Sequence, residues 1–504
     1  MVLRTKKEYQ STFISSNSVY QKLIPDDDYF SKINKEFDFD FIYDEVKKFY
    51  CENNGRPAKD PIQMFKACLV QRLKGLTDPE MEIAAKYDIR IKHFLGISID
   101  DYGFDYSTIW VFRERLGSKT FEVIFNKLLS QIVDKGIIKN PDQQFIDSMP
   151  ILSQAALPSV TCLIYMGIKD VIKSLDKTMG HEIFNMTELN DTKLLHYSKP
   201  RPIFRKDQKE KMKAFEKGVS RARIIISYLN KKEINNDEIE LLKQILNENV
   251  DCDNERIQTE KPIKTLADKD AKLGHKTKED LIFGYKNHSL VSAEGIITAV
   301  EVSSAAERDD KQFEQLVRKA EDNNLKPKEV EGDSAYGFIE TFKTAESLNV
   351  ILNSNFRGVS IDELSIYELK YDSQTHTITC QNNISVQLKG KDKLRAEFPI
   401  RTCRSCPKKD KCQLSNSKRI VFHKDHDVAR RALARQRLNE EKKKVAKEKG
   451  EKIKSRLIIE NVFAYLKKLG GKVTSYFNFE RTKTHVLLVS TISNLMKTVR
   501  INTN

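Results

Sequence analysis

The 504-residue chain is poor in tryptophan, glycine and proline, with one Trp, 19 Gly and 13 Pro. Such a composition excludes collagen-like and low-complexity chains, and no internal repeat is found. The chain lacks an apolar run of 18 or more residues, so no transmembrane helix is predicted. No apolar signal segment follows residues 1–7. We therefore expect a cytoplasmic, globular protein of about two to four domains, with no membrane partner.

Positive charge is abundant. The net charge is +15, and residues 401–456 hold 20 Lys and Arg against 7 Asp and Glu. A basic segment of this kind predicts a polyanionic partner, and DNA or RNA is the first interpretation. A solubilising charged surface would give the same composition, so charge alone does not decide between the two.

Four of the eight cysteines lie close together in the sequence: Cys380, Cys403, Cys406 and Cys412. The Cys-x2-Cys pair has the spacing of a zinc half-site, whereas the other two intervals are irregular. A cytosolic protein keeps such thiols reduced, so disulfides are not expected. Two interpretations stay open, namely a zinc site and a small apolar cluster of reduced thiols.

Helix start and stop signals mark the first part of the chain. Asp60-Pro61 opens a predicted helix that ends near Gly75, because Asp favours the N-cap, Pro the first turn and Gly the C-terminal stop. Similar signals recur through residues 20–135, with apolar residues at helical spacing. We expect an all-helical N-terminal domain over residues 1–138.

A short helix over residues 108–116 has two interpretations. It could be a DNA-recognition helix with Arg113 and Arg115 facing the groove. Trp110 and Phe112 on the same segment favour burial, which predicts a packing helix without DNA contacts.

The remainder predicts a mixed α/β core over residues 139–360 and 451–504. A hairpin about Glu294-Gly295, then helices alternating with strands, is typical of such a layer. Two segments interrupt it. Residues 155–280 contain a helical insertion, and residues 361–450 form a β-rich insertion that carries the cysteines and ends in a basic helix.

Three acidic residues have the spacing expected for metal chemistry. Asp147 and Asp333 each end a predicted strand, and Glu460 lies on a late helix. On that helix Glu460 and Lys467 lie about 40° and 20° around the axis from Arg456. Hard cations such as Mg²⁺ take carboxylate oxygens, and a pair of them supports phosphoryl transfer. The ordinary alternatives are turn acids and a solvated i,i+4 ion pair.

The motif on the late helix resembles the DDE transposases of bacterial insertion sequences. One subgroup carries a Tyr-x2-Arg-x3-Glu-x6-Lys signature, and its last three positions fall on Arg456, Glu460 and Lys467. The Tyr position is occupied by Ile453, so the DNA contact of that phenol is absent or supplied by another residue.

Other segments share the resemblance. The first family aspartate falls on Asp147 within Phe-Ile-Asp-Ser, and the second on Asp333 within Gly-Asp-Ser-Ala-Tyr-Gly. The segment Phe283–His288 is similar to the family's second strand, and residues 55–116 to its helical N-terminal domain. The Cys403–Cys412 run is similar to a Cys-rich insert of related elements.

The resemblance implies an α/β fold with an RNase H-like catalytic core, an all-α N-terminal domain and inserted segments. It implies that Asp147, Asp333 and Glu460 bind two Mg²⁺ ions, for which Mn²⁺ can substitute. Arg456 and Lys467 would hold phosphate near the active site.

The implied activity is a transposase acting on double-stranded DNA in the bacterial nucleoid. It would bind terminal inverted repeats as a homodimer, cleave the element ends and join the 3′-hydroxyls to target DNA. Lys286 on the second strand would be a further backbone contact, or a solvated lysine. Two alternatives remain: a catalytically inactive DNA-binding descendant, and a metal-dependent nuclease without strand transfer.

Overall fold

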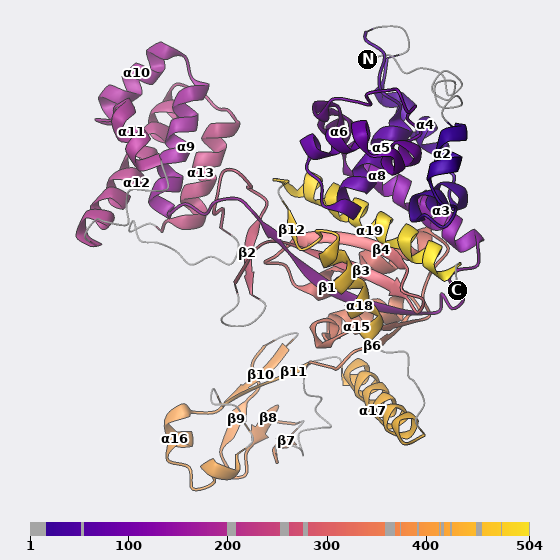
Figure 1. The fold of residues 1–504 in the computed structure, drawn as a ribbon. Helices are drawn as coiled ribbons and strands as arrows, with labels where there is room; N and C mark the ends of the chain where they lie inside the picture. Colours follow the sequence, from indigo (N-terminus) through magenta and orange to yellow (C-terminus); the bar gives the residue numbers. More distant parts are fainter. Residues whose placement is uncertain are drawn as a thin grey trace.

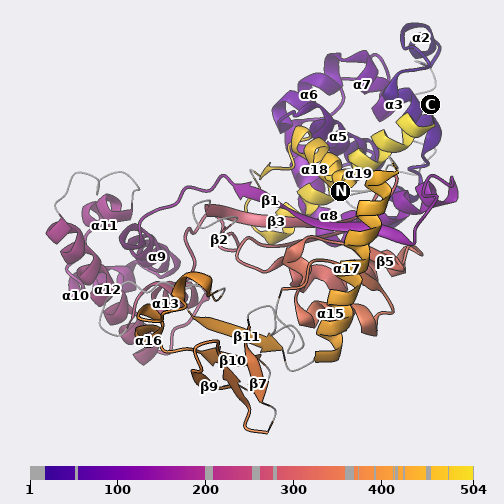
Figure 2. The ribbon, with the colours of Figure 1, turned by 90° about the horizontal axis from the view of Figure 1, so that it is seen from below.

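A computed structural model of the chain describes most of the sequence. The described residues are 17–51, 55–198, 208–251, 262–275, 281–357, 368–372, 374–390, 393–412, 414, 418–423, 426–449, 456–474 and 476–502. Figure 1 shows the ribbon, and Figure 2 shows it turned by 90°.

Among the described residues, a seven-stranded mixed sheet occupies the centre of the molecule. Its strands are β1 (Gln143–Ser153), β2 (Lys272–His275), β3 (Leu281–Ser292), β4 (Ile297–Ser304), β5 (Glu329–Glu331), β6 (Ile351–Asn353) and β12 (Val473–Thr474). The main order is β2-β3-β1-β5-β6, while β4 pairs with β3 and β12 with β1. Strand β3 runs antiparallel to β1 and β4, whereas β5 runs parallel to β1 and β6. The predicted mixed α/β layer and its hairpin are confirmed.

Helices cover both faces of the sheet. Because side chains alternate along a strand, Phe145 and Met149 of β1 belong to one core and Ile146 to another. The Phe145 face packs against α18 (Leu457–Lys468) and α19 (Phe479–Ile501). The Ile146 face packs against α14 (Phe313–Asp322) and α15 (Ile339–Ser347). Whether a polar side chain of β1 faces α18 and α19 or α14 and α15 therefore depends on its position in this alternation.

The N-terminal part is helical, as predicted. Its helices are α2 (Asn17–Leu23), α3 (Tyr29–Glu36), α4 (Phe41–Val46), α5 (Pro61–Lys74), α6 (Asp78–Tyr87), α7 (Ile89–Leu95) and α8 (Tyr106–Asp134). Asp60 caps α5 through the Ile62 N–H, and Gly75 ends it with φ of 69°. Gly117 breaks α8 with φ of 64° and ψ of 169°, so the expected stop there is confirmed.

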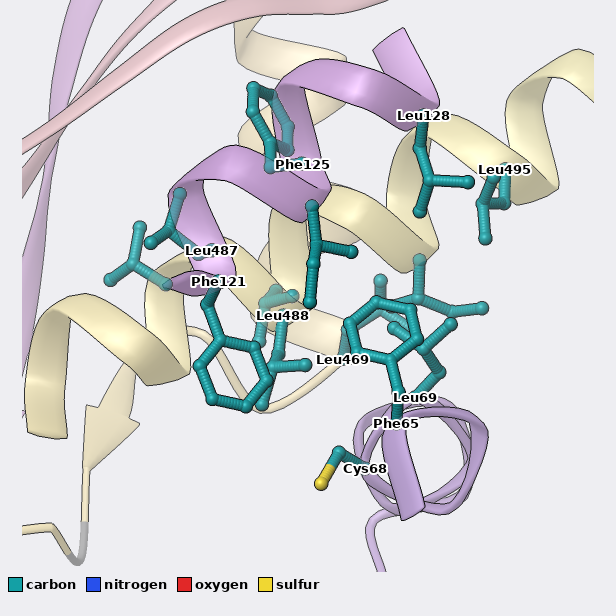
Figure 3. Close-up of a cluster of buried hydrophobic side chains, with 14 of the residues drawn as sticks. Phe65, Cys68, Leu69, Phe121, Phe125, Leu128, Leu469, Leu487, Leu488 and Leu495 are labelled. Atoms are coloured by element: carbon teal, nitrogen blue, oxygen red, sulfur yellow. The ribbon is translucent and has the colours of Figure 1, made fainter. Parts of the chain in front are cut away.

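One apolar core joins these helices to α19 (Figure 3). Phe121 and Leu128 of α8 and Phe65 of α5 lie against Leu488 and Leu495 of α19. All five side chains are almost fully buried. Burial of each contributes about 1.5–3 kcal/mol, so the N-terminal helices are held firmly on the C-terminal helix.

The first insertion has a core of its own. It comprises α9 (Val160–Ser174), α10 (Lys177–Met186), α11 (Asp191–Ser198), α12 (Gln208–Lys231) and α13 (Asp237–Asn249). Its buried side chains form a separate cluster that includes Ile164, Tyr165, Phe215, Val219 and Leu242. In both ribbon views this lobe stands apart from the N-terminal helices.

The second insertion is small and mostly β-structure. It contains β7 (Lys370–Asp372), β8 (Thr377–Thr379), β9 (Ser385–Gln387), β10 (Lys393–Glu397), α16 (Ile400–Arg404) and β11 (Arg419–His423). The basic helix α17 (His426–Glu448) follows it. The predicted β-rich character and the basic helix are confirmed, while the exact division into domains stays a prediction.

Two expectations are wrong. Strand β1 continues to Ser153, so Asp147 lies inside the strand, because pairing with β3 continues through Leu152. Trp110 is 50% exposed, because the inner face of α8 is filled by Ile109, Phe112 and their neighbours. None of the helices in the described ranges is both long and apolar enough to cross a membrane.

Candidate functional site

Asp147 and Asp333 are brought together by the parallel pairing of β1 and β5. The register pairs Phe145 with Glu331. Asp147 follows Phe145 by two residues, and Asp333 follows Glu331 by two residues. Because parallel partners at one level point to the same face, both carboxylates are directed to the α18 side of the sheet. The negative charge of Asp333 acts on Asp147 strongly enough to help raise its pKa.

The turn after β5 explains the local sequence around Asp333. Its carboxylate accepts the Ala335 N–H at 2.8 Å and caps a short 3-10 turn over Ser334–Tyr336. A Cβ on Gly337 would lie 1.8 Å from the Asn355 carbonyl oxygen, so only glycine fits there. Asp333 thus has the ordinary turn-capping role in addition to its place beside Asp147.

Arg456 forms an ion pair with Asp147. Its Nη2 lies 2.9 Å from Asp147 Oδ2, while the Ser148 N–H donates to Oδ1 at 2.8 Å. The Asp147 and Arg456 side chains are only 17% and 31% exposed. Burial raises the pKa of the Asp147 carboxyl and Asp333 adds to that shift, whereas Ser148 and Arg456 oppose it. The site is therefore a desolvated pair of acids that carries one compensating cation.

Helix α18, which begins just after Arg456, carries Glu460 and Lys467. Ile459, Phe463 and Leu466 form its buried stripe and fix its rotation on the core. Glu460 is exposed and lies one turn after Arg456, with its N–H donating to the Arg456 carbonyl at 3.2 Å. Lys467 is exposed two turns further along the same face.

Ser148, Asp309 and Tyr336 were not predicted for the site but also lie in it. Ser148 Oγ donates to Asp309 at 2.7 Å, and Lys286 Nζ donates to the same carboxylate at 2.7 Å. Burial raises the pKa of the Tyr336 phenol, and the charges of Asp309, Asp147 and Asp333 add to that rise. No sequence motif points to Asp309, since an acid at a helix start is commonplace.

The carboxylates fit divalent cations in kind. Asp147 and Asp333 are hard oxygen donors, and the guanidinium on Asp147 shows that this desolvated carboxylate is stabilised by a positive charge. Glu460 is not part of that contact, and no three His, Cys, Asp or Glu side chains in the described part of the chain are arranged to hold a metal ion. The structure thus brings together two of the three predicted acids and places the third on the neighbouring helix.

Three basic residues predicted to bind DNA have partners within the protein. Arg113 is 6% exposed and bonds Asp78 at 2.6 and 3.0 Å. Burial alone lowers the pKa of Arg113, but the bond to Asp78 and the neighbouring charges outweigh it and raise the pKa overall. The Arg115 guanidinium lies 4.6 Å from the centroid of the Tyr50 ring. Lys286 bonds Asp309 and is 15% exposed. These contacts bind Arg113 and Lys286 to other parts of the protein, and DNA binding by Arg113, Arg115 and Lys286 stays a prediction.

The four cysteines of the second insertion are free thiols, and Cys380, Cys403 and Cys412 pack against its small apolar core. Burial raises the pKa of Cys403, and the charges of Cys380, Cys412 and Cys406 contribute, so the four sulfurs lie near one another. Lys418 Nζ lies 3.6 Å from Cys412 Sγ. The described geometry holds no assembled metal group there, and zinc stays a prediction. Ile453, at the signature Tyr position, lies outside the described residues.

Two models of transposase families match parts of the chain. A family model described as a transposase domain (DUF772) matches residues 18–115, and one described as a transposase DDE domain matches residues 250–495. The second match includes Asp333 and Glu460, while Asp147 precedes it. No curated protein and no solved structure matches the chain.

The mixed sheet and the two family matches together define the class of the protein as a transposase. The chain belongs to the DDE transposases of the insertion-sequence type. Membership implies DNA as the partner and divalent metal ions such as Mg²⁺ as the cofactor.

Proposed function

We propose that the chain cleaves the ends of its own mobile element and joins them to target DNA, with Asp147, Asp333 and Glu460 as the catalytic acids. The observation that carries this proposal is the register that sets Asp147 beside Asp333, on the face covered by the helix of Glu460. The strand order β4-β3-β1-β5-β6, with only β3 reversed, supports an RNase H-like core.

The three acids would hold two Mg²⁺ ions, with Mn²⁺ able to replace them. When bound, these cations would activate the attacking oxygen and stabilise the leaving oxygen of the phosphodiester. Water would attack at the element end, forming one P–O bond and breaking another to free a 3′-hydroxyl. That hydroxyl would then attack a target phosphodiester in line, forming a new P–O bond while the target strand's own P–O bond breaks and its 3′-hydroxyl leaves.

The other residues of the site would position the DNA and the acids. Arg456 and Lys467 flank Glu460 on one helical face and would bind phosphate oxygens, since both are cations beside the proposed centre. The Ser148–Asp309–Lys286 bonds would hold β1 against β3 and the start of the α14 segment, which keeps Asp147 in place.

The remaining features belong to the same proposal. The helical residues 1–138 would bind the terminal inverted repeats, residues 139–360 with 451–504 would form the catalytic core, and two chains would hold the paired ends as a homodimer. The cysteines of residues 361–450 would bind zinc. The protein would act at the bacterial nucleoid in the cytoplasm.

A DNA-joining assay tests the activity. Full-length protein is mixed with labelled terminal-repeat duplex, target plasmid and Mg²⁺, and a matched reaction contains EDTA. The proposal expects joined product that disappears in Asp147→Asn, Asp333→Asn and Glu460→Gln, while gel-shift affinity changes little. Cut but unjoined product would favour the nuclease alternative, and a shift without cutting would favour the inactive DNA-binding alternative.

A further inference from the structure

A cavity of about 940 Å³ lies between helix α17 and the ends of β5 and β6. Asp333 and Arg456 lie on the sheet side of it, so the cavity opens directly beside the candidate active site. Arg435, Gln436 and Lys442 of α17 line the opposite wall. None of these α17 residues belongs to the family signature described above.

Only the first half of α17 is packed on the core. Ala429 and Ala432 are buried, and Ala432 joins the apolar cluster of the β5–β6 side. Arg431 forms a bidentate ion pair with Glu346 of α15, at 2.9 and 2.8 Å. The Phe356 N–H donates to Gln436 at 3.3 Å. The helix is thus anchored in its first half, and residues of its second half, from Leu438 to Ala446, line the cavity. Figure 2 shows α17 as one long helix beside β5 and α15.

The cavity wall of α17 is a polar stripe. Arg435, Gln436, Asn439 and Lys442 are spaced by one, three and three residues, which places them on one face of the helix. Arg435 and Lys442 lie two turns, about 10 Å, apart along the axis. Residues 426–448 hold eight Lys and Arg against four Asp and Glu, so the helix as a whole is basic.

The wall on the sheet side of the cavity is acidic. Glu329 and Glu331 of β5 and Asp333 of the following turn line it, and Glu440 and Glu441 of α17 also reach the cavity. A small anion would meet these carboxylates at close range, so this is not a simple anion pocket. A phosphodiester strand suits the two walls better, because its phosphates can face Arg435 and Lys442 while cations held by the acids offset the other side.

We propose that the second half of α17 is an arm that grips the DNA backbone beside the active site, with Arg435 and Lys442 as its phosphate contacts. This inference rests on the proposed function, since it assigns the DNA strand at the reacting end to this cavity. In the sequence, the last residue of α17, Glu448, is eight positions before Arg456, which directly precedes the catalytic helix α18.

A matched pair of full-length variants tests the arm. Lys442→Ala removes a charge that lines the cavity, whereas Lys444→Ala removes a charge of the same helix that does not line it. Affinity for a terminal-repeat duplex is measured by fluorescence anisotropy across a salt series in EDTA. Thermal unfolding of each variant is measured alongside, to compare their folding with that of the wild type.

Lys442→Ala is expected to lower the slope of log affinity against log salt by about 0.9, which is about eightfold in affinity at 0.1 M salt. Lys444→Ala is expected to leave the slope unchanged. Equal effects of both variants, or no effect of either, would overturn the proposal. So would an unchanged slope on DNA together with a reduced slope on RNA.

The assay also separates this inference from the proposed function. Binding in EDTA does not depend on cleavage or joining. A reduced salt slope in Lys442→Ala, together with no joining by the wild-type protein, would contradict the proposed enzymatic activity but still support DNA binding by α17. Normal joining with an unchanged Lys442→Ala slope would remove the arm alone.

Discussion

Arg456 Nη2 lies 2.9 Å from Asp147 Oδ2, although the two residues are 309 positions apart in the sequence. This ion pair ties the start of the late helix α18 to the middle strand of the sheet. It also places Arg456, a candidate phosphate-binding residue, in direct contact with Asp147, a candidate metal ligand. A cation at Asp147 would have to compete with that guanidinium, so the proposed roles would couple metal binding and DNA binding through Arg456.

Arg456→Gln is expected to bind Mn²⁺ about tenfold more tightly than the wild type in the absence of DNA. The reason is that the cation no longer meets a guanidinium on Asp147, and a tenfold change corresponds to about 1.4 kcal/mol. Isothermal titration calorimetry measures the affinity, with Arg456→Lys as the charge-retaining control. The same affinity in Arg456→Gln and wild type would show that the ion pair does not oppose the metal.

Arg113→Ala is expected to lower the free energy of unfolding by about 3 kcal/mol, since it leaves Asp78 and Gln71 without their partner in a largely buried site. Urea unfolding measures the change. Arg115→Ala, on the same helix and only partly buried, serves as the control and should cost less. If Arg113→Ala kept wild-type stability but lost binding to the terminal repeat, Arg113 would be a DNA contact and not a structural residue.

Acid is expected to weaken the contact between α5 and α19 through His485. Its Nδ1 accepts from Arg72 at 2.9 Å and its Nε2–H faces the Gly470 carbonyl at 3.3 Å, so the ring is neutral. Burial and the Arg72 charge lower the pKa of His485 to about 3. The unfolded chain takes up this proton near pH 6.5, so the free energy of unfolding falls as pH drops from there toward 3.

His485→Gln should therefore reduce the pH dependence of unfolding by up to about 1.4 kcal/mol per pH unit below pH 6.5. Urea unfolding at pH 7.5 and pH 5.5 measures it. His181→Gln on exposed α10 is the matched control and should keep the wild-type dependence. An identical dependence in His485→Gln and wild type would contradict the neutral, buried ring.

The cysteine cluster yields a direct metal measurement. Protein purified without chelator is expected to contain one zinc per chain, and Cys406→Ser is expected to lose it, because four thiolates complete a structural site. Cys51→Ser, at an exposed position outside the cluster, should keep the zinc. No zinc in the wild type, with unchanged stability of Cys406→Ser, would establish the reduced-thiol alternative.

Local signals in the sequence predicted the helices and the hairpin well. Asp60, Gly75 and Gly117 act through hydrogen bonds and φ values of their own neighbourhood, so their effects can be recognised without the fold. The hairpin about Glu294-Gly295 is similarly local. The acids were found through short motifs, and the pairing of β1 with β5 then places Asp147 beside Asp333.

Partners supplied by distant segments could not be predicted. Arg113 is buried because Asp78 and Gln71, on other helices, fold over it. Lys286 is neutralised by Asp309, 23 residues later, and nothing in the sequence distinguishes that acid from other helix-start acids. The length of β1 likewise depends on its pairing with β3 rather than on its own residues.

The central claim is that Asp147, Asp333 and Glu460 share one metal centre. Fe²⁺ can replace Mg²⁺ at carboxylate sites, and with ascorbate and peroxide it cuts the backbone next to the bound ion. With terminal-repeat DNA bound, we predict cuts near all three residues, abolished together by Asp333→Asn or by excess Mg²⁺. Cuts that include Asp147 and Asp333 but never the segment around Glu460, or no cuts at any of the three, would contradict the account.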